Sequence, residues 1–511
     1  MPDNIDLKSP ENTQARADGD FLKFPYVSEV GRLTDYGYNK NLFLGKHFKA
    51  FNIRIDDPIY ANKEYYMMRY LSANFPGLIS KIMADLLFIE PPKIRADDGD
   101  QNFIDALQSD NKMRVQNYES ALMNSYFGDG LYKLRVGKRR QSDKETSVII
   151  EQVTPRIYFP VYDPANVTGE PLEQELAWVV TIAGRPYLRK EIHKPGLIKN
   201  QLWELEGTPQ IGYKIKHEAD IGLLNIPGLL PEVVTGIDRS LLIHIPNWRP
   251  GERHFGLSDY YDLDTLFYAI NNRLTKVDNI LDKHGDPILA VPPGIIGEDG
   301  KIKKKQLGVI ELAEGEEGKP EYIVWDAKLD SAFSQMDRLI ETVFMISETS
   351  PVVAGLDKGG NLESGRALKY KMLRTIAKAQ RKQLYYTEGL KEVFYVAQLL
   401  AKEYNVKIDG VGLTQKPVKP EIVWSDGLPA DMTELIDNEI KRIDAGLTST
   451  PDAIARIDDV DEDTAEKKAK EIKAEKQIDL KSMQGVAKNG FGGGVDSDRP
   501  ASKPNGFATK N

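Results

Sequence analysis

Positive charge is concentrated on one predicted helix of an otherwise acidic chain. Seven basic residues occur from Arg366 to Lys382, and the next acidic residue is Glu388, whereas the whole chain carries a formal net charge of −9. At about 100° per residue, one helix face receives five of them: Lys371, Arg374, Lys378, Arg381 and Lys382. This face could lie near a polyanion or between subunits. It could equally be a solvated face paired with acids of a neighbouring element, and the spacing leaves both interpretations open.

A glycine-containing loop precedes this helix and could contact a smooth, moving ligand. Residues 350–362 combine apolar side chains with a single lysine and several glycines. The segment is also longer than most connections between helices. One interpretation is a flexible loop that touches a ligand, and the other is a plain connector. The residues assigned to the contacting loop are Pro351, Val352, Val353, Leu356, Lys358, Gly359, Gly360 and Asn361.

A third cluster of charge lies in a short β-rich insertion between residues 285 and 327. Four lysines precede a group of acids from Glu311 to Glu317, and a hairpin would bring the two groups face to face. This arrangement fits a solvated turn, or a docking surface for a partner protein. The lysines concerned are Lys301, Lys303, Lys304 and Lys305.

The chain lacks the common catalytic motifs. It has no phosphate-binding P-loop, no His-Glu-x-x-His, no G-x-S-x-G and no dinucleotide-binding glycine pattern. Its six histidines show no metal-ligand spacing. The acidic run Asp458–Asp463 lacks the glycine and the terminal glutamate of a calcium loop, and favours a helix start. We therefore predict no catalytic residue, no metal site and no cofactor.

Length and composition restrict the class of protein further. The 511 residues predict two to four domains, and 41% hydrophobic residues suffice for packed cores. Cysteine is absent, which excludes disulfides and cysteine-ligated metals. No apolar run approaches about 18 residues, so we expect a soluble protein with no membrane contact. A pI near 5.5 argues against tight DNA binding but is compatible with letting DNA pass.

Two amphipathic helices flank the β-rich insertion. The first is expected from Ser258, as N-cap, to about residue 284, and the second from about Lys328 to Glu348. A third and much longer helix follows from Glu363, over roughly 40 residues or about 60 Å. Each of the first two has one apolar stripe that a lone hairpin cannot bury, so we expect packing against other copies. These packing residues are Leu263, Phe267, Ile270, Leu274, Val277, Leu281, Phe333, Met336, Ile340 and Val343.

The rest of the chain predicts an α+β protein with a polar beginning and end. Residues 1–39 form a partly disordered arm, and 40–256 form helices followed by antiparallel strands. The expected helices cover 57–89, 103–107 and 115–126; the expected strands are 132–136, 148–153, 157–161, 177–182, 202–205 and 241–245. Residues 428–483 are helical, and the Gly-rich residues 484–511 form a disordered tail.

Seven short stretches, in this order and spacing, resemble the portal proteins of tailed double-stranded DNA bacteriophages, in particular those of siphophages. Each stretch is weakly specific alone, and together they span residues 40–460. They are Phe75–Pro92 with Asn74 at its start, Phe127-Gly-Asp-Gly130, Gly256-Leu-Ser-Asp-Tyr260 through Pro287, Ser347–Gly355, Glu363-Ser-Gly-Arg-Ala-Leu368, Leu428-Pro-Ala-Asp431 and Ala445-Gly-Leu-Thr-Ser449.

The resemblance implies an architecture for each stretch of the chain. The portal fold has an α/β wing, a two-helix stem, a small β-containing clip, a tunnel loop, a long wing helix and a helical crown. On this chain the wing would be 40–256, the stem 257–284 and 328–349, the clip 285–327, the tunnel loop 350–362, the long helix with its return to the wing 363–427, and the crown 428–483.

The resemblance also implies a function. Portal proteins form a homo-oligomeric ring, usually a dodecamer, at one capsid vertex of the virion, after assembly in the host cytoplasm. Double-stranded DNA passes through the ring. The implied partners are the terminase large subunit, a head-completion or adaptor protein, and the major capsid and scaffolding proteins.

Two other functions stay open at this stage. One is a magnesium-dependent nucleic-acid-processing enzyme of unrecognised class, which would need carboxylates that converge at strand ends. The acids of this chain lie instead on predicted helix faces and turns. The other is a capsid adaptor that forms no pore, against which the helix–insertion–helix layout argues.

Overall fold

The computed structural model divides the chain into two units, Met1–Leu428 and Pro429–Asn511. It describes residues 23–52, 70–96, 99–140, 142, 145–163, 170–208, 212–224, 226, 228–251, 253–285, 288–291, 309–311, 321–323, 329–356, 369–425, 432–458, 460 and 464–475.

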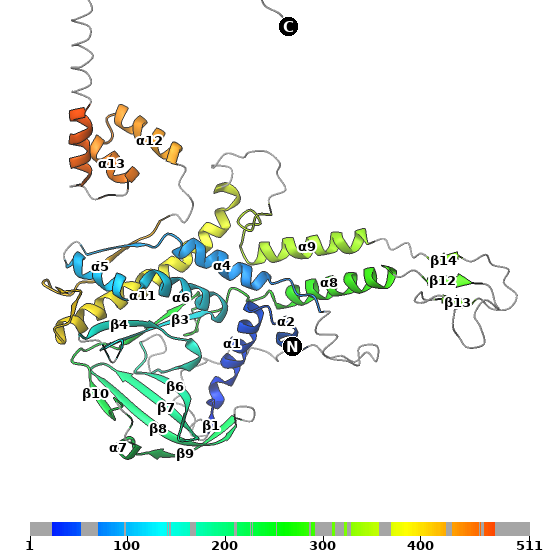
Figure 1. Cartoon of the computed structure of the whole chain (residues 1–511), viewed down its shortest axis with the longest axis horizontal. Coiled ribbons are helices and arrows are strands. Elements are labelled where there is room, and N and C mark those ends of the chain that lie inside the picture. Colours follow the sequence, from blue (N-terminus) through cyan, green and yellow to red (C-terminus); the bar gives the residue numbers. More distant parts are fainter. Residues whose placement is uncertain are drawn as a thin grey trace, which may run out of the picture. The chain divides into compact units, whose positions relative to one another are not determined.

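The larger unit mixes helices and strands, as the α+β prediction requires (Figure 1). Its helices are η2 (Val27–Glu29), α1 (Val30–Phe43), α2 (His47–Ala50), α4 (Phe75–Phe88), α5 (Gln101–Asp110), α6 (Met113–Phe127), η4 (Pro155–Ile157), α7 (Ile221–Leu224), α8 (Asp264–Gly285), α9 (Asp330–Ile346) and α11 (Leu373–Glu403). Local chemistry sets several ends: the Asn74 side chain caps α4 by accepting from the Gly77 N–H at 3.0 Å, and α6 ends at Gly128, whose φ of 92° favours glycine.

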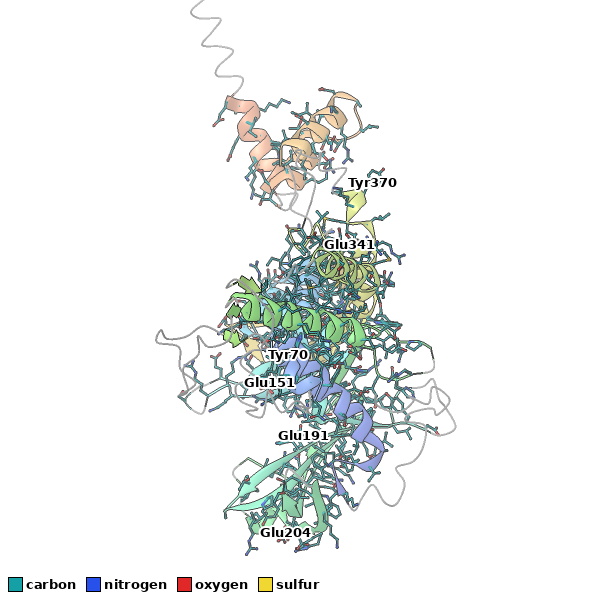
Figure 2. The ribbon with its side chains drawn as sticks, turned by 90° about the vertical axis from the view of Figure 1, so that its right-hand side faces the viewer. Tyr70, Glu151, Glu191, Glu204, Glu341 and Tyr370 are labelled. Carbon is teal, nitrogen blue, oxygen red and sulfur yellow. The ribbon has the colours of Figure 1, made fainter. Side chains whose placement is uncertain are left out.

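A largely antiparallel meander forms the seven-stranded sheet. Its strands are β1 (Lys23–Phe24), β5 (Tyr158–Val161), β6 (Glu173–Ile182), β7 (Arg185–Lys194), β8 (Leu197–Thr208), β9 (Gly212–Ala219) and β10 (Glu232–Val234). Their order is β1-β9-β8-β7-β6-β5, and β10 pairs with β8. Figure 2 labels Glu191 and Glu204 on this sheet and Glu341 on α9, towards opposite ends of the unit.

Smaller sheets complete the larger unit. β3 (Asp129–Gly137) lies between β11 (Leu242–Pro246) and β4 (Ser147–Gln152). Two short pairs join β2 (Lys93–Arg95) to β17 (Glu421–Val423), and β15 (Lys407–Ile408) to β16 (Val411–Gly412). The β2–β17 pair returns the chain after α11 to the region of α4, so distant segments share one core.

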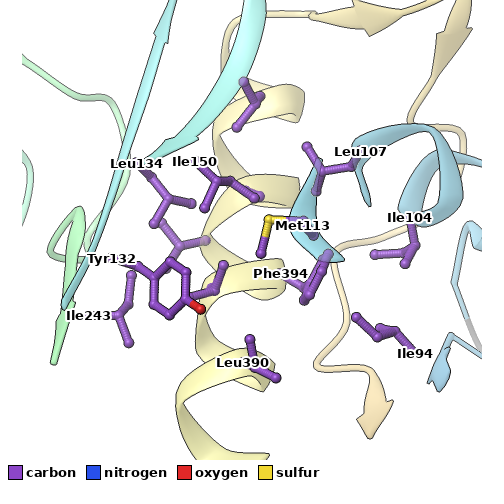
Figure 3. Close-up of a cluster of buried hydrophobic side chains, with 14 of the residues drawn as sticks. Ile94, Ile104, Leu107, Met113, Tyr132, Leu134, Ile150, Ile243, Leu390 and Phe394 are labelled. Atoms are coloured by element: carbon purple, nitrogen blue, oxygen red, sulfur yellow. The ribbon is translucent and has the colours of Figure 1, made fainter. Parts of the chain in front are cut away.

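The main hydrophobic core surrounds α11 (Figure 3). Leu390 and Phe394 of α11 are fully buried and belong to one cluster with β3, β4, β11, α5 and α6. Burying each such side chain stabilises the fold by about 1.5–3 kcal/mol. The labelled members of the cluster are Ile94, Ile104, Leu107, Met113, Tyr132, Leu134, Ile150, Ile243, Leu390 and Phe394. The long helix α11 thus lies at the centre of the main core of the larger unit.

Helices α8 and α9 lie side by side and lead to a small sheet (Figure 1). This sheet has β12 (Ile288–Val291) in the middle, parallel to β13 (Val309–Glu311) and antiparallel to β14 (Glu321–Ile323). All three strands lie within residues 285–327, the insertion that the sequence predicts to be β-rich. Lys301, Lys303, Lys304 and Lys305 lie outside the described residues.

The smaller unit contains α12 (Met432–Asp444), α13 (Thr450–Asp458) and a helix over residues 464–475. α12 stops before Gly446, whose φ of 70° suits glycine. Ser449 caps α13: its hydroxyl accepts from the Asp452 N–H at 3.2 Å, while the Asp452 carboxylate accepts from the Ser449 N–H at 3.3 Å.

Several boundaries differ from the sequence-based expectation. Residues 23–39 are no arm, because β1 joins the large sheet and Tyr36 of α1 is buried in a core. The first hairpin helix begins at Asp264, since residues 258–263 form turns rather than a capped helix. Residues 53–69 lie outside the described residues, and they include the first part of the helix expected over 57–89. Tyr70 and Leu71, which follow, are not helical. β7 and β9 were missed.

The first prediction concerns the stability of the protein when Gly389 of α11 is replaced. A Cβ at Gly389 would lie 2.4 Å from Ile245 Cδ1, so Gly389→Ala should destabilise the protein by about 1–3 kcal/mol in denaturant unfolding. Gly37→Ala is the matched control, because nothing lies within 4 Å of that position in α1. It should stabilise by up to about 1 kcal/mol. Equal effects of the two substitutions would contradict the close packing of α11 on β11.

Candidate functional site at the junction of the hairpin and the long helix

A buried carboxylate connects the start of the hairpin to α11. Asp259 has no exposed side-chain surface, and it lies 3.1 Å from the Lys378 ammonium and 2.7 Å from that of Lys382. Both lysines are also buried, at 8% and 3% exposure. A buried charge is tolerated only when it is paired and hydrogen-bonded. The three side chains therefore form one ion cluster that fixes residues 258–263 to the long helix.

Neutral side chains also donate hydrogen bonds to the Asp259 carboxylate oxygens. Ser125 of α6 donates its hydroxyl to Asp259 at 2.6 Å, and the Asn247 amide donates to it at 3.2 Å. Lys382 also donates to the Asn247 side-chain oxygen. Asn247 in turn holds the Leu257 carbonyl at 2.9 Å. Since α6, α11 and the residue that follows β11 all contribute, the cluster ties the segment before α8 to three parts of the larger unit.

Two glycines allow the chain to approach this close. A Cβ at Gly256 would lie 2.1 Å from the Gly128 carbonyl oxygen, and one at Gly128 would lie 2.7 Å from the Gly256 carbonyl. The Asn247 N–H donates to the same Gly128 carbonyl at 2.8 Å. Both glycines belong to stretches that carried the resemblance to portal proteins, and their contact explains why glycine is needed at each.

Burial and neighbouring charges shift the pKa values of Asp259 and Lys382. Burial would raise the pKa of Asp259, but the ammonium groups of Lys378 and Lys382, with hydrogen bonds from Lys382 and Ser125, hold that pKa well below its usual range. Burial lowers the pKa of Lys382 to about 8; Asp259 opposes this shift, and the charge of Lys378 adds to it. With these pKa values, Asp259 and Lys382 are both ionised at neutral pH.

The end of α9 is attached to the same face of α11. Lys378 donates to the Ser347 carbonyl at 2.9 Å. The Thr375 hydroxyl donates to the Glu348 carbonyl at 3.1 Å and accepts from the Ser350 N–H at 2.7 Å. Arg381 donates to the Glu348 carboxylate at 2.7 Å. The base of the 350–362 loop is therefore held by side chains one or two turns apart on one helix.

The described start of the loop is a series of turns. The Val353, Ala354 and Gly355 N–H groups each donate to the carbonyl three residues earlier. Val352 and Val353 are half-buried, whereas Pro351 and Leu356 are exposed. The other loop residues singled out in the sequence lie outside the described residues: Lys358, Gly359, Gly360 and Asn361.

The five residues of the predicted basic face divide into two groups. Lys378 and Lys382 are not on a solvated face, because both are buried against Asp259. Arg381 and Arg374 are exposed and lie 2.7 and 3.9 Å from Glu348, and Lys371 is exposed. Four of the five residues are thus paired with acids of a neighbouring element, which is the second of the two interpretations of this spacing.

The ten predicted packing residues differ in their exposure along the hairpin. Six are buried within this chain: Leu263, Phe267, Ile270, Val277, Met336 and Val343. Leu274 and Ile340 are partly buried in the same cluster, which also includes Tyr36 of α1 and Ile79 of α4. Only Leu281 and Phe333, near the β12–β14 end, are exposed, at 52% and 44%. Most of the apolar stripe is therefore covered without a second copy.

The contacts at this junction attach the hairpin to α11 through ion pairs and hydrogen bonds. In the part of the chain that the structure describes, no group of three or more His, Asp or Glu side chains could hold a metal ion. The described helices also include none that is long and apolar enough to cross a bilayer.

Sequence reasoning identified the lysines but missed their partners. Asp259 and Glu348 both stand in short polar stretches, Ser258-Asp259-Tyr260 and Ser347-Glu348-Thr349, that read as ordinary turns or caps. Nothing in such a stretch signals burial. The only sequence feature that could have indicated buried ion pairs was the number of lysines on a helix that must also pack against the core.

The comparisons with known proteins give the family. The chain matches the family described as phage portal protein, SPP1 Gp6-like, over residues 28–170 and 244–481. The chain belongs to this phage portal protein family. The unmatched stretch between these ranges holds β6 to β10 of the large sheet. The two matched ranges include every residue of the Asp259 cluster and of the α9–α11 contact.

Among solved structures, the chain is similar to proteins of gene transfer agent particles. One, from the virion of a native gene transfer agent particle, has 12% identity and a TM-score of 0.40, over 82% of this chain and 98% of that one. Another, from the neck of a native particle computed with C12 symmetry, has 14% identity and a TM-score of 0.38, over 78% and 93%. No curated protein sequence matches this chain.

Removing the buried carboxylate makes the second prediction. Asp259→Asn leaves two ammonium groups without their counter-charge and should destabilise the protein by about 3–5 kcal/mol. Arg374→Ala is the control on the same helix: its side chain is 80% exposed, so its cost should stay within about 0.5 kcal/mol. The measurement is the unfolding midpoint in denaturant. A small effect of Asp259→Asn would show that the cluster does not hold the junction.

A third prediction concerns pH. The pKa of Lys382 is about 8 in the folded protein and about 10.4 in an unfolded chain. Between these values the unfolded state binds the proton more strongly, so this residue adds stability as the pH rises. Wild type should therefore gain stability relative to Lys382→Met from pH 8 to pH 10 in parallel unfolding curves. A constant or falling difference would contradict the burial of the ammonium.

Proposed function

We propose that this chain forms the portal ring at one vertex of a virion capsid, through which double-stranded DNA is packaged and later ejected. The observation that supports this most strongly is the family match over 28–170 and 244–481. The ring is a homo-oligomer, a dodecamer in the particle, assembled in the host cytoplasm. It is a structural channel without catalysis of its own.

The segments of the portal fold correspond to elements of this structure. The wing comprises β1 to α6 and the sheets up to residue 256, with α11 and β17. Helices α8 and α9 form the stem, β12–β14 belong to the clip, and residues 350–362 form the tunnel loop. Helices α12 and α13 belong to the crown. Because β1 and α1 are part of the folded core, the wing begins at residue 23 rather than 40.

The junction geometry supports a loop that acts on DNA from a fixed base. Thr375, Lys378 and Arg381 hold Ser347–Ser350 on α11, which is buried in the main core. A force on the loop would therefore be passed to the wing rather than absorbed by a flexible hinge.

The use of positive charge inside the chain supports DNA passage without tight binding. Each lysine or arginine that contacts phosphate adds salt-dependent affinity, and tight contacts would slow a sliding duplex. Four of the five basic residues on the predicted α11 face are paired with Asp259 or Glu348 of the same chain. Lys378 and Lys382 are buried and therefore closed to phosphate. Glu348 offsets part of the charge of the exposed Arg374 and Arg381.

The partners follow from the same proposal. The clip would dock the terminase large subunit during packaging and a head-completion or adaptor protein afterwards. Lys301, Lys303, Lys304 and Lys305 would supply positive charge for these contacts. The wing would contact the major capsid and scaffolding proteins.

The tunnel loop supplies the fourth prediction. Deleting Val353–Gly359 should leave ring assembly intact, because the loop base stays attached to α11, and should lower the nuclease-protected DNA per particle several-fold. The measurement is a packaging assay, with assembly checked by electron microscopy. Replacing the same residues by a Gly/Ser sequence of equal length is the control for lost chain length. Normal packaging by the deletion variant would reduce the loop to a connector.

A further inference from the structure

The hairpin presents two chemically different surfaces. A groove of about 250 Å³ runs between α8 and α9. It combines the apolar side chains of Tyr268 and Leu339 with the positive charges of Arg273 and Lys276. Both charged residues are exposed, and Tyr268 is 44% exposed. We call this surface the α8 groove.

The second surface is a stripe along α9. Phe333, Asp337, Glu341 and Met345 follow each other at intervals of four residues, so they lie along one side of the helix. All four are exposed, Met345 at 75%. We call this surface the α9 stripe. It has apolar ends and an acidic middle, and Arg338 lies at its margin.

The two surfaces lie on opposite flanks of α9. With 3.6 residues per turn, the groove residues Gln335 and Leu339 are roughly 160° around the helix from the middle of the stripe. The core-facing side between them carries Met336 and Val343, which are buried. A hairpin with different surfaces on its two flanks can join copies head to tail, and such heterologous contacts close into rings.

We propose that the α9 stripe of one copy seats in the α8 groove of the next copy around the ring. Asp337 and Glu341 would then face Arg273 and Lys276 across the interface. Phe333 and Met345 would cover the apolar parts of the groove. This inference rests on the proposed portal ring and names the surfaces that set its subunit contact.

Charge argues for this pairing over the alternatives. A two-fold contact would place groove against groove, with Arg273 and Lys276 facing their own copies, and like charges across an interface cost several kcal/mol. Nucleic acid would be repelled by Asp337 and Glu341 of the stripe. A second copy, offered in head-to-tail order, complements both surfaces at once.

Charge reversal and rescue in the full-length protein test the proposal. Lys276→Glu and Asp337→Lys alone should each raise the protein concentration at half-assembly by at least about tenfold, because each brings like charges together. The double variant should return to within a few-fold of wild type. Native mass measurement and negative-stain images report assembly, and thermal unfolding of each variant reports folding. Lys216→Glu on β9, where the side chain is exposed, is the matched control and should assemble as wild type does.

The outcomes separate this inference from the proposed function. Wild-type rings with loss in both single variants and rescue in the double variant support the pairing. Wild-type rings with singles that assemble normally, or a double variant weaker than either single, overturn the pairing and leave the ring standing. A wild-type chain that forms no ring at any concentration, in the presence of the scaffolding protein, overturns both.

Discussion

The structure depends on one buried ion cluster. Asp259 has no contact with water, and it is acceptable in the core only because Lys378 and Lys382 lie within 3.1 Å of it. This requirement fixes the position of residues 258–263, just before α8, relative to α11. Lys378 extends the constraint to Ser347 at the end of α9, so both helices of the hairpin are attached to one turn of the long helix.

The proposed channel needs a rigid attachment and a weak affinity for DNA, and the geometry of this junction fits both requirements. In that proposal the hairpin carries the contacts between copies and transmits force to the wing, so it must be rigidly attached. The surface that meets DNA must bind phosphate weakly. Placing the lysines of α11 inward meets both needs, since the charges that anchor the hairpin are unavailable to phosphate. The exposed parts of the hairpin, the α8 groove and the α9 stripe, are then left for neighbouring copies.

The sequence predicted what is local and missed what is distant. α4, α6, α8 and α9 followed from apolar periodicity and end signals, and β12 to β14 lie within the insertion that was predicted to be β-rich. α1 was not predicted because two glycines and several polar residues interrupt its apolar pattern. β7 was not predicted because its buried residues include the polar Lys190, Glu191 and His193, which are buried as paired groups. At the site, spacing identified the basic face of α11. Asp259, the acidic partner of the two buried lysines, lies more than a hundred residues away in the sequence. It leaves no periodic signal, so the burial of Lys378 and Lys382 could not be foreseen.

The most direct test of the account is a cryo-electron microscopy reconstruction of the assembled protein with double-stranded DNA in place. The account predicts a closed ring with a central channel. α8 and α9 of adjacent copies should be in contact, residues 350–362 should face the axis, and Lys378 and Lys382 should stay buried against Asp259. A closed dimer or trimer without a channel would contradict the account. So would a ring in which these two lysines turn out to contact the DNA backbone.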